Sequence, residues 1–107
     1  MLKLSPALLA LILSFIGIAM AGAPDAGRQA QLLYLLKHDC GSCHGMTRKG
    51  GLGPALLPEN LRDRPEELLV NTILDGRPGT PMPPWRGELS DADARWLVEA
   101  LNRGEGL

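Results

Sequence analysis

Apolar residues recur along this chain at helical spacing, and no segment alternates apolar and polar residues as a half-buried strand does. Three segments combine this spacing with residues that begin and end helices, and they predict helices over residues 25–39, 65–76 and 90–104. Glycine- and proline-rich stretches separate these segments. The predicted fold class is therefore all-α, in a single small domain.

The ends of the predicted helices rest on local capping signals. Asp63 is the expected N-cap of the second helix and Gly76 its end. Ser90 and Asp93 match a capping box in which aspartate replaces glutamate, and Gly104 closes the last helix. The apolar side chains expected to be buried are Leu32, Leu33, Leu35, Leu36, Leu68, Leu69, Ile73, Leu74, Trp96, Leu97, Val98 and Leu101.

The N-terminal segment has the pattern of an export signal. Lys3 precedes an almost uninterrupted apolar run over residues 7–20. This run is shorter than the roughly 20 residues that a membrane-spanning helix needs. We therefore expect a cleaved signal peptide over residues 1–21, with an uncleaved membrane anchor as the alternative.

Small residues offer two cleavage sites, after Ala21 and after Ala23. Cleavage after Ala23 would leave Pro24 beside the cut, where its ring hinders a peptidase, so we favour Ala21. The exported domain then covers residues 22–107, and its expected location is the periplasm.

The composition excludes several classes of protein and exposes a structural deficit. The 11 basic and 12 acidic residues nearly balance, which does not suit a nucleic-acid-binding protein. Hydrophobic residues make up 45% of the chain, too many for a disordered polymer, but only 4% is aromatic. So small and aromatic-poor a domain needs stabilisation beyond its own core.

The residues Cys40, Gly41, Ser42, Cys43 and His44 form the C-x-x-C-H signature of covalent haem attachment. Two thiols at this spacing can form thioethers with the two vinyl groups on one haem edge. The histidine that follows is then held at the iron, where its imidazole can bind. The motif therefore predicts one covalently bound haem c.

Two other interpretations of the cysteines carry less weight. A thioredoxin-like redox pair would require a βαβ context, which the pattern does not show. A structural zinc site would require four ligands, and His38 is poorly spaced to supply one of them.

Met82 is the expected second axial ligand of the iron. It lies in the proline-rich segment 77–85, where restricted backbone freedom presents the thioether at low entropic cost. Methionine ligation raises the potential of an electron-transfer haem. The alternatives are that Met82 only packs in the loop, or that His38 is the ligand. Met46 follows His44 too closely to reach the other side of the haem.

Gly53 and Pro54 complete the expected site. A carbonyl oxygen in this rigid turn can accept the second imidazole N–H of His44 and so set the orientation of the ring. Pro54 is therefore a candidate cofactor-site residue that acts through His44, and a plain turn is the alternative.

The helix leading into Cys40–His44, the Gly53-Pro54 turn, the middle helix, Met82 and the closing helix together resemble a class I cytochrome c. The likeness covers essentially all of residues 22–107. More narrowly, the chain is similar to the c55X-type cytochromes encoded beside periplasmic cytochrome cd nitrite reductase. The resemblance implies three to four helices around one covalent haem. It also implies electron exchange with that reductase or with the proteins that make its d-type haem.

One feature departs from the family pattern. Class I members cross their first and last helices with a glycine against an aromatic residue, whereas this chain has Leu32 and Ala100 at those positions. We hypothesise that large and small residues have been exchanged, which conserves the volume of the crossing.

The expected function is one-electron transport by a non-enzymatic monomer that is soluble after signal cleavage. Arg48, Lys49, Arg77 and Arg86 flank the two haem-binding loops, and we expect them to form a positive collar that steers an acidic partner. The alternative is that these four charges are dispersed over the surface and solvated. The alternatives are a haem-based sensor or ligand-binding protein with a labile Met82, and a haem assembly factor.

Overall fold

The computed structural model describes Lys3 and residues 22–107, so the predicted signal peptide lies, except for Lys3, outside the described residues. The described part contains only helices, turns and loops, and this confirms the all-α fold class. The elements in chain order are α2 (Ala26–Leu35), the π-helical segment η1 (Leu36–Cys40), α3 (Gly41–His44), α4 (Pro58–Leu61), α5 (Glu66–Asp75) and α6 (Asp91–Arg103).

The first helical run is longer than predicted and carries the C-x-x-C-H motif itself. Asp25 caps α2 by accepting a hydrogen bond from the backbone N–H of Arg28. The apolar pattern fades after Leu36, but the backbone stays helical through η1 and α3. The run ends where Gly45 takes a φ of 90°, a value that glycine adopts without strain. The motif therefore lies at a helix end and not in a loop.

The start of α5 corrects a prediction. Its N-cap is Pro65 and not Asp63, and no side chain caps it. Glu66 and Glu67 lie in the first turn, where their negative charges stabilise the helix by interacting with the positive end of its dipole. The short helix α4 was not predicted. It is a single helical turn with Pro58 at its first position, where proline is well tolerated.

The predicted capping box of α6 is present in the structure. The Ser90 hydroxyl accepts from the backbone N–H of Asp93, and the Asp93 carboxylate accepts from the backbone N–H of Ser90. Gly104 ends the helix in the left-handed conformation, with a φ of 66°. Both ends of α6 thus follow from local residue chemistry.

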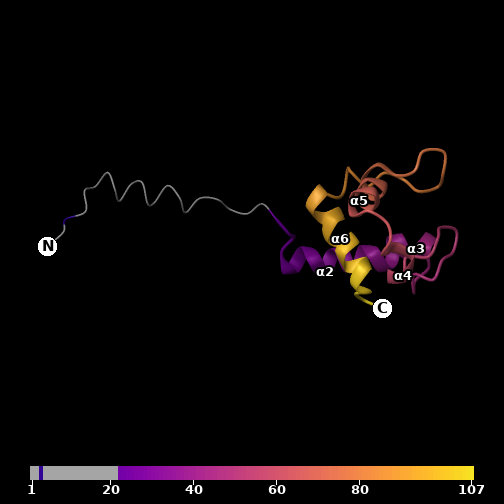
Figure 1. Ribbon diagram of the computed structural model, residues 1–107, viewed down its shortest axis with the longest axis horizontal. Coiled ribbons are helices and arrows are strands. Elements are labelled where there is room, and N and C mark those ends of the chain that lie inside the picture. Colours follow the sequence, from indigo (N-terminus) through magenta and orange to yellow (C-terminus); the bar gives the residue numbers. More distant parts are fainter. Residues whose placement is uncertain (1–2, 4–21) are drawn as a thin grey trace.

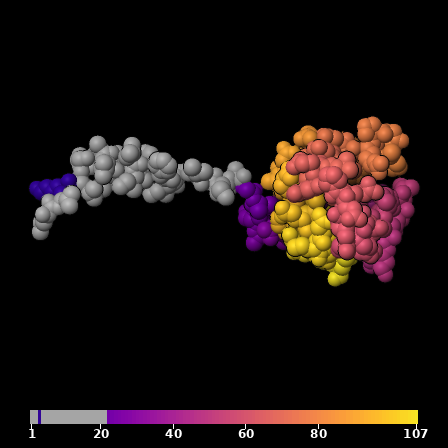
Figure 2. Space-filling model, in the orientation of Figure 1, coloured from indigo at the N-terminus to yellow at the C-terminus, as the bar shows by residue number. Residues whose placement is uncertain are grey.

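The core lies where α6 packs against α5, α4 and α2, and Figure 1 shows α6 crossing α2. In Figure 2 the yellow atoms toward the C-terminus lie beside the pink and salmon atoms of the segment that contains α4 and α5. All four predicted core residues of α6 are buried. On α5 the prediction of Leu68 was wrong, because its side chain is 49% exposed and Val70 is buried instead. The interior is mainly aliphatic, and its fully buried members are Leu32, Leu74, Leu97, Val70 and Val98.

Leu32 and Ala100 both have no exposed surface and belong to one core cluster. Contact between α2 and α6 brings their helices together. This is the arrangement that the exchange hypothesis requires, and the exchange itself stays a prediction. Within residues 22–107, no helix is both long and apolar enough to cross a bilayer.

Candidate functional site

The two cysteines of the motif lie at the junction of η1 and α3, half-buried and not joined to each other. Burial, together with the negative charge of Asp39, raises the pKa of the Cys40 thiol to about 11. A catalytic redox pair depends on a cysteine with a lowered pKa. The structure therefore disfavours a thioredoxin-like role, while a neutral thiol remains available for thioether formation.

The His44 imidazole is fixed by the turn that follows the motif. Its Nδ1 atom lies 2.7 Å from the carbonyl oxygen of Pro54, which can only accept a hydrogen bond. Nδ1 therefore carries the proton, and the Nε2 lone pair is left for a metal ion.

A close approach of the backbone supports this arrangement. A Cβ atom at Gly53 would lie 2.8 Å from both Nδ1 and Cε1 of His44, so the imidazole packs directly on the glycine backbone. Only glycine fits here without displacing the ring or the turn.

The loop between α3 and α4 folds back onto the motif through its own backbone. The N–H of Gly50 donates to the His44 carbonyl at 2.9 Å, and that of Gly53 donates to the Cys43 carbonyl at 2.8 Å. These bonds occupy carbonyl groups that the end of α3 leaves without helical partners. The loop and the motif thus form one unit.

Met82 is held in a second loop, which is anchored at the C-terminal end of α5. The Met82 carbonyl accepts from the backbone N–H of Arg77 at 3.1 Å, and its own N–H donates to the Thr80 hydroxyl at 3.3 Å. Farther along, the N–H groups of Trp85 and Arg86 donate to the carbonyl oxygens of Ile73 and Leu74. The loop therefore has a defined shape although it contains no regular element.

The described contacts join four of the predicted residues into one cluster: Cys40, Cys43, His44 and Pro54. Met82 stands apart from them in sequence, on the loop between α5 and α6. In Figure 1 this loop and the loop after α3 both extend to the right-hand side of the domain. His38 stacks on Tyr34, with ring centroids 4.2 Å apart.

The predicted positive collar needs correction. Arg48 is only 5% exposed, so it is not a surface charge. Arg86 pairs with the Asp75 carboxylate at 2.9 Å, which offsets its charge. Lys49 and Arg77 are exposed, as the prediction required. Arg48, which was expected on the surface, is buried because the C-terminal residues Glu105 and Gly106 lie against its guanidinium.

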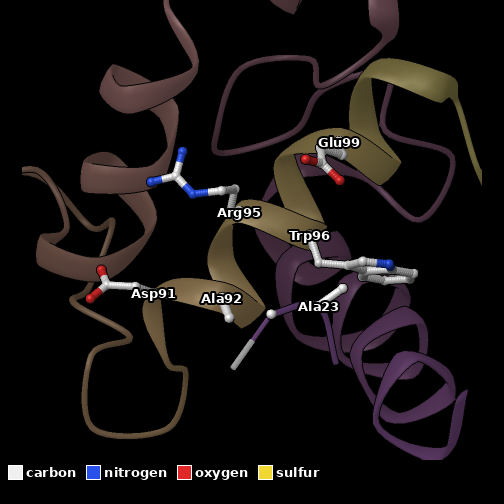
Figure 3. Close-up of a pocket in the computed structure, with 7 residues that line it drawn as sticks. Ala23, Asp91, Ala92, Arg95, Trp96 and Glu99 are labelled. Atoms are coloured by element: carbon white, nitrogen blue, oxygen red, sulfur yellow. The ribbon is translucent and has the colours of Figure 1, made fainter. Parts of the chain in front are cut away.

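Two surface hollows lie outside the four-residue cluster. Figure 3 shows the first, of about 370 Å³, where the Trp96 ring lies beside Ala23 and charged residues of α6 form the rim. None of the predicted site residues lines it. The second hollow, of about 490 Å³, is lined by Lys37, Met46, Thr47, Lys49, Leu57, Gly106 and Leu107. It adjoins the motif, because the Met46 sulfur would lie 3.2 Å from a Cβ atom at Gly41.

The chemistry of the motif residues fits a covalent haem. Unpaired thiols, an imidazole with one nitrogen already hydrogen-bonded, and a thioether on a braced loop are the groups that such a cofactor requires. Zinc would instead need a group of His, Cys, Asp or Glu side chains, and residues 22–107 contain no group of three or more suitably placed.

Comparison with known proteins agrees with this chemistry. Residues 26–99 match the family described as cytochrome c oxidase, cbb3-type, subunit III. Cytochrome c55X of Pseudomonas aeruginosa is 66% identical over 82 residues, covering 77% of this chain and 69% of the relative. The solved structure of the c-type cytochrome NirC, also 66% identical, matches with a TM-score of 0.75 and covers 77% of this chain and 96% of that one.

A larger protein contains a similar segment. The structure of dihydro-heme d1 dehydrogenase NirN in complex with DHE is 43% identical with a TM-score of 0.60. The match covers 64% of this chain but only 15% of that protein. These findings show that the chain belongs to the c-type cytochromes of the cytochrome c55X family, which are electron-transfer proteins with covalently bound haem c.

Proposed function

We propose that this chain is an exported carrier of single electrons with one haem c, attached through Cys40 and Cys43 and ligated by His44 and Met82. The observation that carries the proposal is the hydrogen bond between His44 Nδ1 and the Pro54 carbonyl, which leaves Nε2 free to bind iron. The bound haem supplies a ferric/ferrous couple that accepts and releases one electron.

The protein residues position the His44 imidazole and the Met82 thioether, and they exclude a substrate from the iron. Pro54 and Gly53 fix the imidazole plane, so the ring does not reorganise when the charge of the site changes. The hydrogen bonds within residues 77–82 restrict the Met82 loop. If His44 and Met82 both held the iron, they would leave no position for a substrate, which favours electron transfer over a sensor or a ligand-binding protein.

The family relationship supports a role in nitrite reduction. The proposed partners are cytochrome cd nitrite reductase and the proteins that complete its d-type haem. The similarity to a segment of dihydro-heme d1 dehydrogenase supports the second partner class, because that enzyme carries a related domain of its own. The signal-peptide pattern of residues 1–21 supports a periplasmic location.

The hollow beside the motif is the proposed docking surface for an acidic partner. Lys37 and Lys49 provide positive charge at its edge, and the exposed side chains of Met46 and Leu107 provide apolar contact. Opposite charges speed association and make its rate depend on salt. This surface replaces the collar expected from sequence.

Optical spectra of the purified holoprotein test the proposed ligation. We expect reversible one-electron reduction, the long-wavelength ferric band of methionine ligation, and no carbon monoxide binding to the reduced protein. Ready carbon monoxide binding would instead support the sensor alternative. A colourless, helical product from a host competent to mature c-type cytochromes would overturn the proposal.

Stopped-flow mixing with each proposed partner tests the pathway. We expect rapid electron transfer that slows as ionic strength rises, and a further decrease in rate in K37Q/K49Q. The matched control is R62Q/R64Q, which removes two exposed charges outside the hollow. Equal rates for the two double variants would argue against this docking surface.

A further inference from the structure

Arg48 is a charged residue held inside the protein by an unusual backbone. Its φ is 61°, the only positive value among the non-glycine residues that the structure describes. Its N–H donates to the Gly45 carbonyl, and its own carbonyl accepts from the N–H of Leu56. This conformation costs a non-glycine residue of the order of 1–3 kcal/mol, and it persists only where the surrounding structure imposes it.

The guanidinium of Arg48 is incompletely paired. Its Nη2 donates to the backbone carbonyl of Glu105, beyond the end of α6. Its Nη1 is buried and has no hydrogen-bond partner within residues 22–107. The Glu105 carboxylate forms its hydrogen bond with Arg103, at 2.7 Å, and acts on Arg48 only through its charge. The positive charge is therefore buried with only part of its ordinary compensation.

Arg48 lies beside the haem-attachment motif, because its N–H donates at 2.9 Å to the carbonyl of Gly45, the residue directly after His44. Its charge also opposes the rise in the pKa of the Cys40 thiol, although burial and the negative charge of Asp39 have larger effects on that pKa. Burial also lowers the pKa of Arg48, but a guanidinium remains charged at any physiological pH. In a site with little water, a fixed charge acts over longer distances than a surface charge does.

We propose that Arg48 is a fixed internal charge that raises the reduction potential of the haem attached at Cys40. Reduction adds one electron to the bound cofactor and lowers its net positive charge by one, and it forms or breaks no bond to Arg48. A nearby cation therefore disfavours the ferric state more than the ferrous state. The proposal rests on the covalent haem and not on the identity of the partner.

Potentiometric titration of the holoprotein tests this proposal. We expect Arg48→Gln to reduce the equilibrium constant for haem reduction about tenfold, a fall of about 59 mV for one electron. Arg48→Lys keeps the charge and should stay close to the parent. The matched control is Arg62→Gln, which removes an exposed arginine and should change the potential much less.

A second pair of variants leaves Arg48 in place and protects the test against misfolding. A Cβ atom at Gly106 would lie 3.1 Å from Arg48 Nη2, and the φ of 79° there is one that aspartate and asparagine tolerate best. Gly106→Asp brings a compensating carboxylate and should lower the potential, whereas the isosteric Gly106→Asn should not.

Equal potentials for Gly106→Asp and Gly106→Asn, or an equal fall in Arg48→Gln and Arg48→Lys, would overturn the proposal and leave Arg48 a structural role. Absence of a haem spectrum in the parent protein would instead overturn the proposed function. Failure of this proposal and failure of the proposed function are therefore distinguishable.

Discussion

Arg28 and Asp93 join the first and last helices through an ion pair, with Arg28 Nη2 2.8 Å from Asp93 Oδ2. The same carboxylate caps α6 through the N–H of Ser90. Arg28 also donates to the backbone carbonyl of Glu88 and to Gln31. One buried carboxylate therefore serves both the local capping of α6 and its attachment to α2.

Replacement of Asp93 should destabilise the domain substantially. Asp93→Asn removes the ion pair and weakens the capping box, at a cost of about 2 kcal/mol. For a domain of this size, this corresponds to a decrease in Tm of roughly 10 °C. Asp91→Asn is the control, because Asp91 is exposed and its ion pair with Arg86 is long, at 3.9 Å. Thermal unfolding followed by circular dichroism measures both, and equal losses would contradict the assigned role.

The same pair predicts how stability depends on pH. The hydrogen bond from Arg28 holds the pKa of Asp93 below its ordinary value of 3.8. The native state therefore favours the ionised carboxylate, and this stabilisation is complete above the unfolded-state pKa. It is lost as the pH falls from about 4 through the lower native pKa. Urea unfolding at several pH values should show the gap between the parent and Asp93→Asn closing in this range.

Gly53→Ala should disturb the proximal histidine. The added methyl would lie 2.8 Å from the imidazole ring, so either the ring or the turn must move. We expect less haem incorporation and a changed absorption spectrum in the protein that is recovered. Gly87→Ala is the control, because a Cβ there meets nothing within 4 Å. Identical spectra for the two variants would show that the contact with Gly53 does not matter for ligation.

Alanine substitutions at two glycines of the Met82 loop distinguish the effect of backbone strain from that of a direct clash. Gly76 and Gly79 have similar positive φ values, 68° and 76°. A Cβ at Gly76 would lie 2.7 Å from the Met82 carbonyl, whereas one at Gly79 meets nothing within 4 Å. We expect Gly76→Ala to weaken the methionine band and to admit carbon monoxide, with a smaller effect from Gly79→Ala. The reverse order would be inconsistent with anchoring of the loop through Gly76.

Met82→Ala tests the axial ligand itself. Loss of the thioether should abolish the ferric methionine band, lower the reduction potential and allow carbon monoxide to bind the ferrous haem. Met46→Ala is the control, because Met46 contacts Gly41 of the motif and lies on the proximal side of the haem by prediction. Retention of the band in Met82→Ala would mean that another residue is the ligand.

The helices and the motif were predictable because their signals are local. The capping box of Ser90 and Asp93, the glycine that ends α6 and the apolar spacing of α6 each depend on residues within a turn or two of one another. The prediction that a carbonyl of the Gly53-Pro54 turn reaches His44 also rested on short sequence separation, and the structure contains that hydrogen bond.

The errors over Leu68 and Arg86 arose because the environment of each comes from distant residues. Leu68 and Val70 both fit the apolar pattern of α5, and only the position of α6 decides which one is buried. Arg86 was expected to belong to a positive collar, but the return of its loop to α5 pairs it with Asp75.

By itself, the sequence determined the three longer helices and the caps of α6, and it indicated the haem-attachment chemistry, because propensity, capping and thiol spacing act between neighbours in the chain. The tertiary structure alone decided that Arg28 reaches Asp93 and that the segment after α6 covers Arg48. Burial and charge pairing depend on residues far apart in the sequence, and only packing of the helices fixes their distances.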